Sequence, residues 1–206
     1  MLLSYEDTEV QHEFISIISS ESERLTRLVN DVLDVTKIEA GQMDWSEDTI
    51  ELSELLEHCT RTFSPLLDQT QLTFKAEIAQ SLPTIRGDRD RIQQVIQNLL
   101  NNALKFTYQG GITLRAFARG GDVCIAVADT GLGIARQDQQ RVFEKFQQVG
   151  DTLTGKPKGT SLGLTICRDI VAHHGGRLTL TSQPGLGSTF SIWLPISKPT
   201  EERLAA

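Results

Sequence analysis

The sequence predicts an α+β fold, a two-layer α/β sandwich in which helices cover one face of a mixed sheet, preceded by a long amphipathic helix. Residues 9–40 contain neither proline nor glycine and carry apolar residues at steps of three and four. After residue 45, segments with helical spacing are interleaved with short alternating segments typical of strands. Such a mixture buries one face of the sheet under the helices.

The first helix ends at Gly41, the first glycine of the chain. About 30 residues at about 1.5 Å each make a helix of about 45 Å. Its apolar residues form a narrow seam of the kind that pairs with other helices, although a lone surface helix is the alternative. We therefore expect self-association through this seam, which consists of Phe14, Ile18, Leu25, Leu28, Val32 and Val35.

The second part of the chain contains the sandwich. We expect a partial helical domain at 1–42, the main domain at 45–196 and a polar tail at 197–206. The predicted elements of the main domain are a strand at 49–52, a helix capped by Ser53 that runs to Asp68, strands at 72–78 and just before Gly87, a helix at 92–106 opened by Asp88, a hairpin of 112–118 and 123–128, a short helix at 139–146, a loop at 147–159, a helix at 161–174 and strands at 177–182 and 189–194.

Composition excludes several classes of protein. The net charge of −7 disfavours a nucleic-acid or anionic-membrane surface, which needs clustered positive charge. No apolar run reaches membrane-spanning length and no signal peptide is visible, although the parent protein could be anchored elsewhere. Three scattered cysteines suit neither a disulfide framework nor zinc, so we expect reduced thiols in a reducing compartment, the cytoplasm.

The helix QVIQNLLNNALKFT carries polar side chains on one face. Asn98, Asn102 and Lys105 follow one another at i, i+4 and i+7, opposite apolar residues. They could cap loops or be solvated. Alternatively, a carboxamide oxygen is a suitable ligand for Mg²⁺, and a lysine supplies a point charge for phosphate.

Three glycine-containing stretches follow. VADTGLGIA places Asp129 at the end of a strand, where its carboxylate could accept a hydrogen bond from an amine such as that of adenine, with glycines that let a flat ring lie close; a hairpin turn is the alternative. GTSLGL (159–164) lies at a helix start, which suits phosphate or an ordinary cap. GLGSTF (185–190) resembles a hairpin turn.

The succession of these motifs resembles the ATP-binding domain of sensor histidine kinases, in the GHKL ATPase superfamily. The asparagine helix, DxGxG, the phenylalanine pair of Phe143 and Phe146, the glycine-rich helix start and the final GxGxT occur in that order over residues 45–195. LVNDVLDVTKIEAGQ (28–42) resembles the second helix of the kinases' dimerisation and phosphotransfer hairpin. The resemblance implies a two-component histidine kinase with the GHKL sandwich, acting with ATP and Mg²⁺.

The resemblance also implies residue roles. Asn98, Asn102 and Lys105 would be the catalytic group, with Asn102 as the Mg²⁺ ligand and Lys105 facing the phosphates. Asp129 would hold the adenine amine, and loop 147–158 would be the ATP lid. The remaining nucleotide contacts would come from Phe106, Gly131, Gly133, Ile134, Gly159, Thr160, Ser161, Leu162, Gly163, Leu164 and Thr189.

Two local departures concern the lid. Ser161 stands where many members have glycine, so lid closure or affinity could change; we expect Ser161→Gly to keep or tighten ATP binding. Gln147 and Gln148 stand where some kinases have arginine.

A larger departure is the phosphoacceptor. The early His12 is followed by no Arg-Thr-Pro, and residues 12–41 leave no room for two antiparallel helices. We therefore expect the acceptor helix to be absent from this chain, and none of His12, His58, His173 and His174 to be phosphorylated. The partners implied are a histidine-bearing helix, a response regulator and a second copy of the chain.

Three functions remain. The leading one is the catalytic region of a histidine kinase that transfers the γ-phosphate to a histidine elsewhere. A nucleotide-binding pseudokinase or scaffold is the second, and the retained Asn102, Lys105 and Asp129 speak against it. Another GHKL ATPase, of the gyrase, mismatch-repair or chaperone type, is the third, and the preceding helix disfavours it.

Overall fold

The computed structural model describes residues 8–67, 70–145 and 162–197. The chain divides into two compact units, residues 1–43 and 44–206. The first unit contains one helix and the second contains the sheet and the remaining helices.

The first unit is the predicted long helix, α1 (Thr8–Glu39). Gly41 follows it with φ of +63°, the left-handed conformation in which glycine commonly ends helices. Much of the apolar seam is exposed to solvent: Ile18 and Leu25 show 65% and 63% of their surface. Ile15 and Leu33, beside the predicted seam, are also exposed.

The second unit is built on a five-stranded sheet in the order β2-β4-β5-β7-β6. The β2–β4 pair is parallel and the other pairs are antiparallel, so the sheet is mixed, as predicted. A separate two-stranded sheet pairs β1 (Asp48–Ile50) with β3 (Ile85–Gly87). The strands of the large sheet are β2 (Thr73–Ile78), β4 (Gly111–Arg119), β5 (Asp122–Asp129), β6 (Arg177–Gln183) and β7 (Gly187–Pro195).

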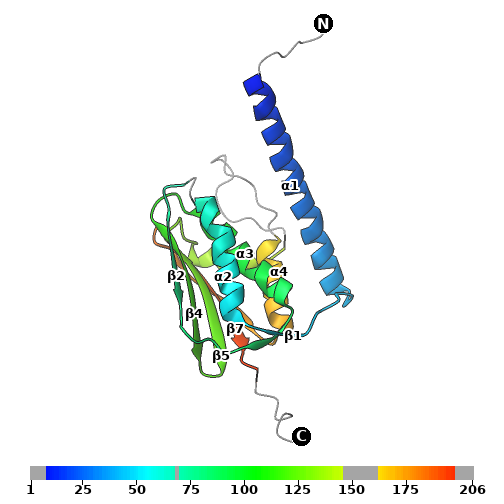
Figure 1. Ribbon diagram of the computed structural model, residues 1–206, viewed down its shortest axis with the longest axis vertical. Coiled ribbons are helices and arrows are strands. Elements are labelled where there is room, and N and C mark those ends of the chain that lie inside the picture. Colours follow the sequence, from blue (N-terminus) through cyan, green and yellow to red (C-terminus); the bar gives the residue numbers. More distant parts are fainter. Residues whose placement is uncertain (1–7, 68–69, 146–161, 198–206) are drawn as a thin grey trace, which may run out of the picture. The chain divides into compact units, whose positions relative to one another are not determined.

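Three helices cover one face of this sheet (Figure 1). They are α2 (Leu52–Leu67), α3 (Arg89–Phe106) and α4 (Gly163–His173). Their apolar faces and the inner residues of the strands make the core, in which Leu55, Ile96 and Ile125 are fully buried. The predicted two-layer sandwich is therefore confirmed.

Sequence patterns misplaced two features. The helix expected at 139–146 is instead two short 3₁₀ segments, Arg136–Asp138 and Arg141–Phe143. The second helix begins at Leu52, so Ser53 lies inside its first turn rather than at the N-cap. The predicted loop at 147–159 and the polar tail beyond residue 197 lie outside the described residues.

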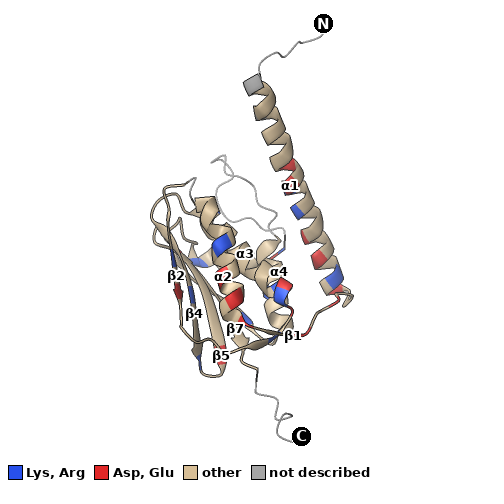
Figure 2. Ribbon diagram, in the orientation of Figure 1, with Lys and Arg blue, Asp and Glu red and all other residues tan. Residues whose placement is uncertain are grey.

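Charges of both signs are interspersed along the elements drawn in Figure 2, without a single-sign face in that view. Among the described residues, no helix has the length and apolar character needed to cross a membrane.

Candidate functional site

The polar face of α3 is held in place by a well-formed helix start. Asp88 is the N-cap, and its Oδ1 accepts a hydrogen bond from the Arg91 N–H at 3.0 Å. The apolar face of the helix, including Leu99 and Leu100, is buried. Asn98 and Asn102 are half-buried on the other face, as the spacing predicts.

Asn98 carries the clearest sign of an unmet interaction. Its Nδ2 atom is buried and has no hydrogen-bond partner among the described residues. A Cβ added to Gly163 would lie 3.7 Å from this nitrogen, so the N-terminus of α4 is next to it. A buried donor without a partner costs stability, and a polar ligand between the two helices would remove that cost.

The N-terminus of α4 begins next to Asn98. Leu162 is the N-cap and provides no side-chain cap, so the first N–H groups of the helix depend on other partners. Gly163 and Leu164 open this helix, which is the site predicted for phosphate. Gly159, Thr160 and Ser161 lie outside the described residues.

Asp129 is the last residue of β5, and one of its two carboxylate oxygens accepts hydrogen bonds from the backbone. Its Oδ1 accepts from the N–H of Gly131 at 2.8 Å and of Ser188 at 3.3 Å. Burial raises the pKa of Asp129, and these two hydrogen bonds only partly oppose that shift. Its Oδ2 has no hydrogen bond among the described residues, which leaves an acceptor for an incoming donor.

The glycines around Asp129 serve backbone packing. A Cβ at Gly131 would overlap the carbonyl oxygen of Phe106, and one at Gly133 would overlap that of Gln183. A Cβ added at Gly187 would likewise overlap the carbonyl oxygen of Asp129. The expectation that these glycines make room for a flat ring thus gains a second reason: they join the DxGxG loop to α3 and to the β6–β7 hairpin.

The structure does not bring Thr189 to Asp129. Thr189 pairs with Ala128, and strand alternation turns its side chain to the outer face of the sheet. Ser188 is the cross-strand neighbour of Asp129 and is buried. Sequence reasoning missed Ser188, because only the strand register, which the motif does not give, shows that it is paired with Asp129.

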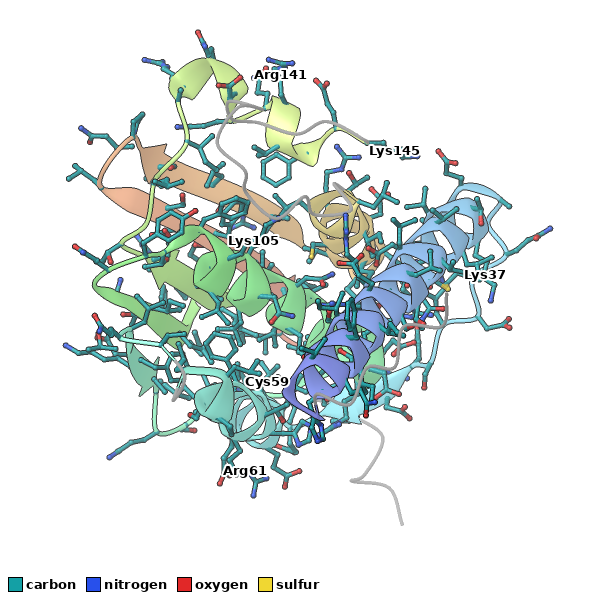
Figure 3. All side chains as sticks on the ribbon, turned by 90° about the horizontal axis from the view of Figure 1, so that it is seen from above. Lys37, Cys59, Arg61, Lys105, Arg141 and Lys145 are labelled. Atoms are coloured by element: carbon teal, nitrogen blue, oxygen red, sulfur yellow. The ribbon has the colours of Figure 1, made fainter. Side chains whose placement is uncertain are left out.

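Lys105 and Phe106 lie together at the end of α3. The Lys105 Nζ is 4.9 Å from the centre of the Phe106 ring, and Lys105 is labelled in Figure 3. Phe106 is 38% exposed and leaves part of its ring open. Ile134 is half-buried in the DxGxG loop, and its N–H donates to the Ser182 hydroxyl at 2.7 Å.

Phe143 links the 3₁₀ segment to α4, because its carbonyl accepts from the Thr165 hydroxyl at 3.0 Å. Phe146 lies outside the described residues.

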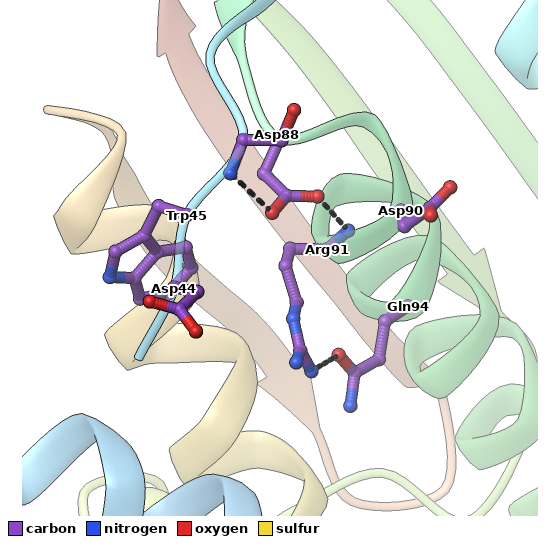
Figure 4. Close-up of a pocket in the computed structure, with 7 residues that line it drawn as sticks. Asp44, Trp45, Asp88, Asp90, Arg91 and Gln94 are labelled. Carbon is purple, nitrogen blue, oxygen red and sulfur yellow. Dashed lines mark hydrogen bonds between the residues drawn. The ribbon is translucent and has the colours of Figure 1, made fainter. Parts of the chain in front are cut away.

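A hollow of about 530 Å³ lies at the opposite end of α3. Figure 4 shows Asp44 and Trp45 across from Arg91, with Asp88 bonded to the backbone of the segment that enters the domain. Asn102 is 14 residues beyond the N-cap, about 21 Å along the helix at about 1.5 Å per residue. The hollow therefore lies far from Asn102, although Gln94, which lines it, is only one helical turn before Asn98.

These groups suit a magnesium–nucleotide complex. Asn102 offers a carboxamide oxygen, a ligand type that Mg²⁺ accepts. The unpartnered Asn98 amide and the start of α4 offer donors for phosphate oxygens. Asp129 offers an acceptor for a base amine.

Comparison with known proteins identifies the family. Residues 87–198, more than half of the chain, match the model of the histidine kinase-, DNA gyrase B- and HSP90-like ATPases. The chain belongs to this ATPase family. Residues 1–41 match the His kinase A phospho-acceptor domain family. Together with its relatives, these matches identify the chain as the ATP-binding catalytic region of a two-component sensor histidine kinase.

Two curated relatives illustrate this kinship. The chain is 37% identical over 205 residues to the circadian input-output histidine kinase CikA of Synechococcus elongatus, covering 95% of this chain and 27% of CikA. It is 36% identical over 183 residues to the sensor histidine kinase RcsC of Escherichia coli, covering 88% of this chain and 19% of RcsC. The chain thus spans less than a third of either relative.

Solved structures agree with the fold. Full-length ShkA in complex with AMPPNP matches with a TM-score of 0.79 at 31% identity, over 92% of this chain and 40% of ShkA. The catalytic domain of histidine kinase ThkA matches with a TM-score of 0.64 at 27% identity, over 76% of this chain and 100% of that domain.

Proposed function

We propose that this kinase region binds Mg·ATP between α3, α4 and the DxGxG loop and transfers the γ-phosphate to a histidine of a separate phosphotransfer helix. The observation that carries the proposal is the buried, unpartnered amide of Asn98 beside the start of α4. Its unmet donor, flanked by backbone donors of a helix N-terminus, suits a phosphate chain.

Different residues bind the base and the phosphates of the nucleotide. Asp129 accepts from the adenine amine, with Ser188 beside it on β7. Gly131, Gly133 and Ile134 shape the base pocket, and Phe106 borders it. Asn98 and the start of α4, together with the rest of the glycine-rich segment 159–164, hold the phosphates.

Phosphoryl transfer depends mainly on positioning and charge neutralisation. Asn102 would hold the magnesium ion, which neutralises phosphate charge when bound. Lys105 adds a positive charge near the phosphates, and its position beside the Phe106 ring limits its freedom. The attacking imidazole comes from the acceptor helix, so no side chain of this domain needs to form a covalent bond.

The test mixes this chain with Mg·ATP and a separately produced hairpin that bears the acceptor histidine. Transfer that yields acid-labile, base-stable phosphate on the hairpin supports the kinase. Saturable ATP binding without transfer would favour a pseudokinase or scaffold, and ATP hydrolysis alone would favour another GHKL ATPase. Stable phosphate on His12, His58, His173 or His174 would contradict the assignment of the acceptor to another helix.

We further propose that the chain forms a homodimer through α1 and passes phosphate from the acceptor to a response regulator. The exposed apolar residues of α1 support the first proposal, because such a surface is typical of helices that pair. The kinship with sensor histidine kinases supports the second. Three buried free cysteines suit a reducing compartment, and we propose a cytoplasmic location.

A further inference from the structure

A row of polar side chains crosses three neighbouring strands at the base end of the site. Asp129 on β5 pairs with Ser188 on β7, which pairs with Ser182 on β6. Because directly paired residues lie on the same face of a sheet, all three side chains project to the helix-covered side. The role of Asp129 follows from the proposed function, and the role of Ser182 does not.

The Ser182 hydroxyl makes three hydrogen bonds. It accepts from the Ile134 N–H at 2.7 Å, it donates to the Gly187 carbonyl at 2.9 Å, and it lies 3.0 Å from the Ser188 hydroxyl. A hydroxyl has a single proton, and the carbonyl of Gly187 can only accept. The Ser188 hydroxyl must therefore be the donor to Ser182, which leaves the lone pairs of Ser188 free to accept.

Gln139 holds the same loop from a second side. Its Nε2 donates to the Ile134 carbonyl at 3.1 Å and to the Ser182 carbonyl at 2.9 Å. The Ile134 N–H is thus bonded directly to Ser182 of β6, and the Ile134 carbonyl is linked to β6 through the Gln139 side chain. The DxGxG loop cannot move relative to β6 without breaking these bonds.

We propose that Ser182 is a positioning residue that makes the site selective for purines with a 6-amino group. It orients the Ser188 hydroxyl as an acceptor next to the Asp129 carboxylate, and it fixes the loop that follows Asp129. Two neighbouring acceptors match an amine with two protons and repel the carbonyl of a 6-oxo purine. This inference rests on the proposed function, because it assumes that the base lies at Asp129.

The test measures binding of two nucleotides in the presence of Mg²⁺: ATP and purine riboside triphosphate, which lacks the 6-amino group. Ser182→Ala is expected to weaken ATP binding about five- to tenfold, the effect of roughly one hydrogen bond, and to weaken the amine-free analogue less than about twofold. Ser182→Thr keeps the hydroxyl and is expected to restore ATP binding. Thr181→Ala, on the outer face of the same strand, is the matched control and should change neither.

A merely structural serine would give a different result. Equal losses for the two nucleotides in Ser182→Ala, or no loss for either, would overturn the inference. Gln139→Met provides a second variant if Ser182→Ala does not fold; it should also weaken ATP more than the analogue, and equal losses there would overturn the inference as well. Failure of the unmodified chain to bind ATP would instead refute the proposed function.

Discussion

Replacing Gly133 by alanine tests whether the glycines of the DxGxG loop serve backbone packing. Gly133 has φ of +67°, and its missing Cβ points at the carbonyl oxygen of Gln183 on β6. An alanine there must tolerate the left-handed conformation and also push the loop away from the β6–β7 hairpin. The substitution therefore carries two costs that can be measured separately.

Gly120 supplies the matched control. It lies in the β4–β5 turn with φ of +60°, and an added Cβ would meet nothing within 4 Å. Gly120→Ala should therefore cost only the conformational penalty, about 1–2 kcal/mol. Gly133→Ala should add an overpacking cost of about 1–3 kcal/mol. Each glycine-to-alanine change also lowers the conformational entropy of the unfolded chain, and this stabilising effect is the same for both variants, so it does not affect their difference.

The assay is urea unfolding followed by tryptophan fluorescence. Both tryptophans, Trp45 and Trp193, lie in the unit of residues 44–206, so the signal reports on the unit that contains both glycines. ATP titration should show weaker binding for Gly133→Ala and unchanged binding for Gly120→Ala. Equal destabilisation of the two variants would refute the packing argument.

Four further predictions concern named side chains of the domain and of α1. Asn98→Leu should abolish Mg·ATP binding in a titration yet leave the free domain as stable or about 1 kcal/mol more stable in urea, because it removes an unpartnered buried amide. Burial raises the pKa of Asp129, so the stabilisation that its protonated carboxyl provides is full below the unfolded pKa of 3.8 and is lost as pH rises through the folded pKa. Asp129→Asn should reduce this loss of stability when urea unfolding is measured from below pH 3.8 to above the folded pKa. His174→Leu should destabilise the domain by about 1–3 kcal/mol, because it leaves the Asp88 N–H without its acceptor, with a control at the exposed His58. Ile18→Glu combined with Leu25→Glu should shift the chain to monomers in sedimentation analysis, and an unchanged mass distribution would contradict dimerisation through α1.

Local patterns predicted most of the fold, because each relevant signal is short-range. Helix periodicity, the Asp88 cap and the hairpin predicted at 112–118 and 123–128 depend on neighbours in sequence, and the structure has all three. The helix predicted at 139–146 was wrong. A few apolar residues at helical spacing are equally compatible with two consecutive 3₁₀ segments, which the structure has instead.

The candidate site was predictable by type more than by geometry. The motifs gave Asp129 as an acceptor and Thr189 as a nucleotide contact, but they did not show that Ser188 is the residue paired with Asp129. A one-residue difference in register reverses the face of every side chain, and register is fixed by the whole hairpin. Ser182 and Gln139 gave no signal because the bonds that bring their segments together, Ile134 N–H to the Ser182 hydroxyl and Gln139 Nε2 to the Ser182 carbonyl, join residues that are 48 and 43 apart in sequence.

The geometry between α3 and α4 depends on bonds far from the phosphates. At the start of α3, the Asp88 N–H donates to Nε2 of His174, which lies at the end of α4, at 2.9 Å. The Nδ1 of His174 is 2.7 Å from the Ile170 carbonyl, so the neutral ring with a proton on Nδ1 satisfies both partners. The two helices are thus joined where α3 begins and α4 ends. Because helices are stiff over 10 or 11 residues, this junction also constrains how closely Asn98, in the middle of α3, approaches Gly163 at the start of α4, where the phosphates are proposed to bind.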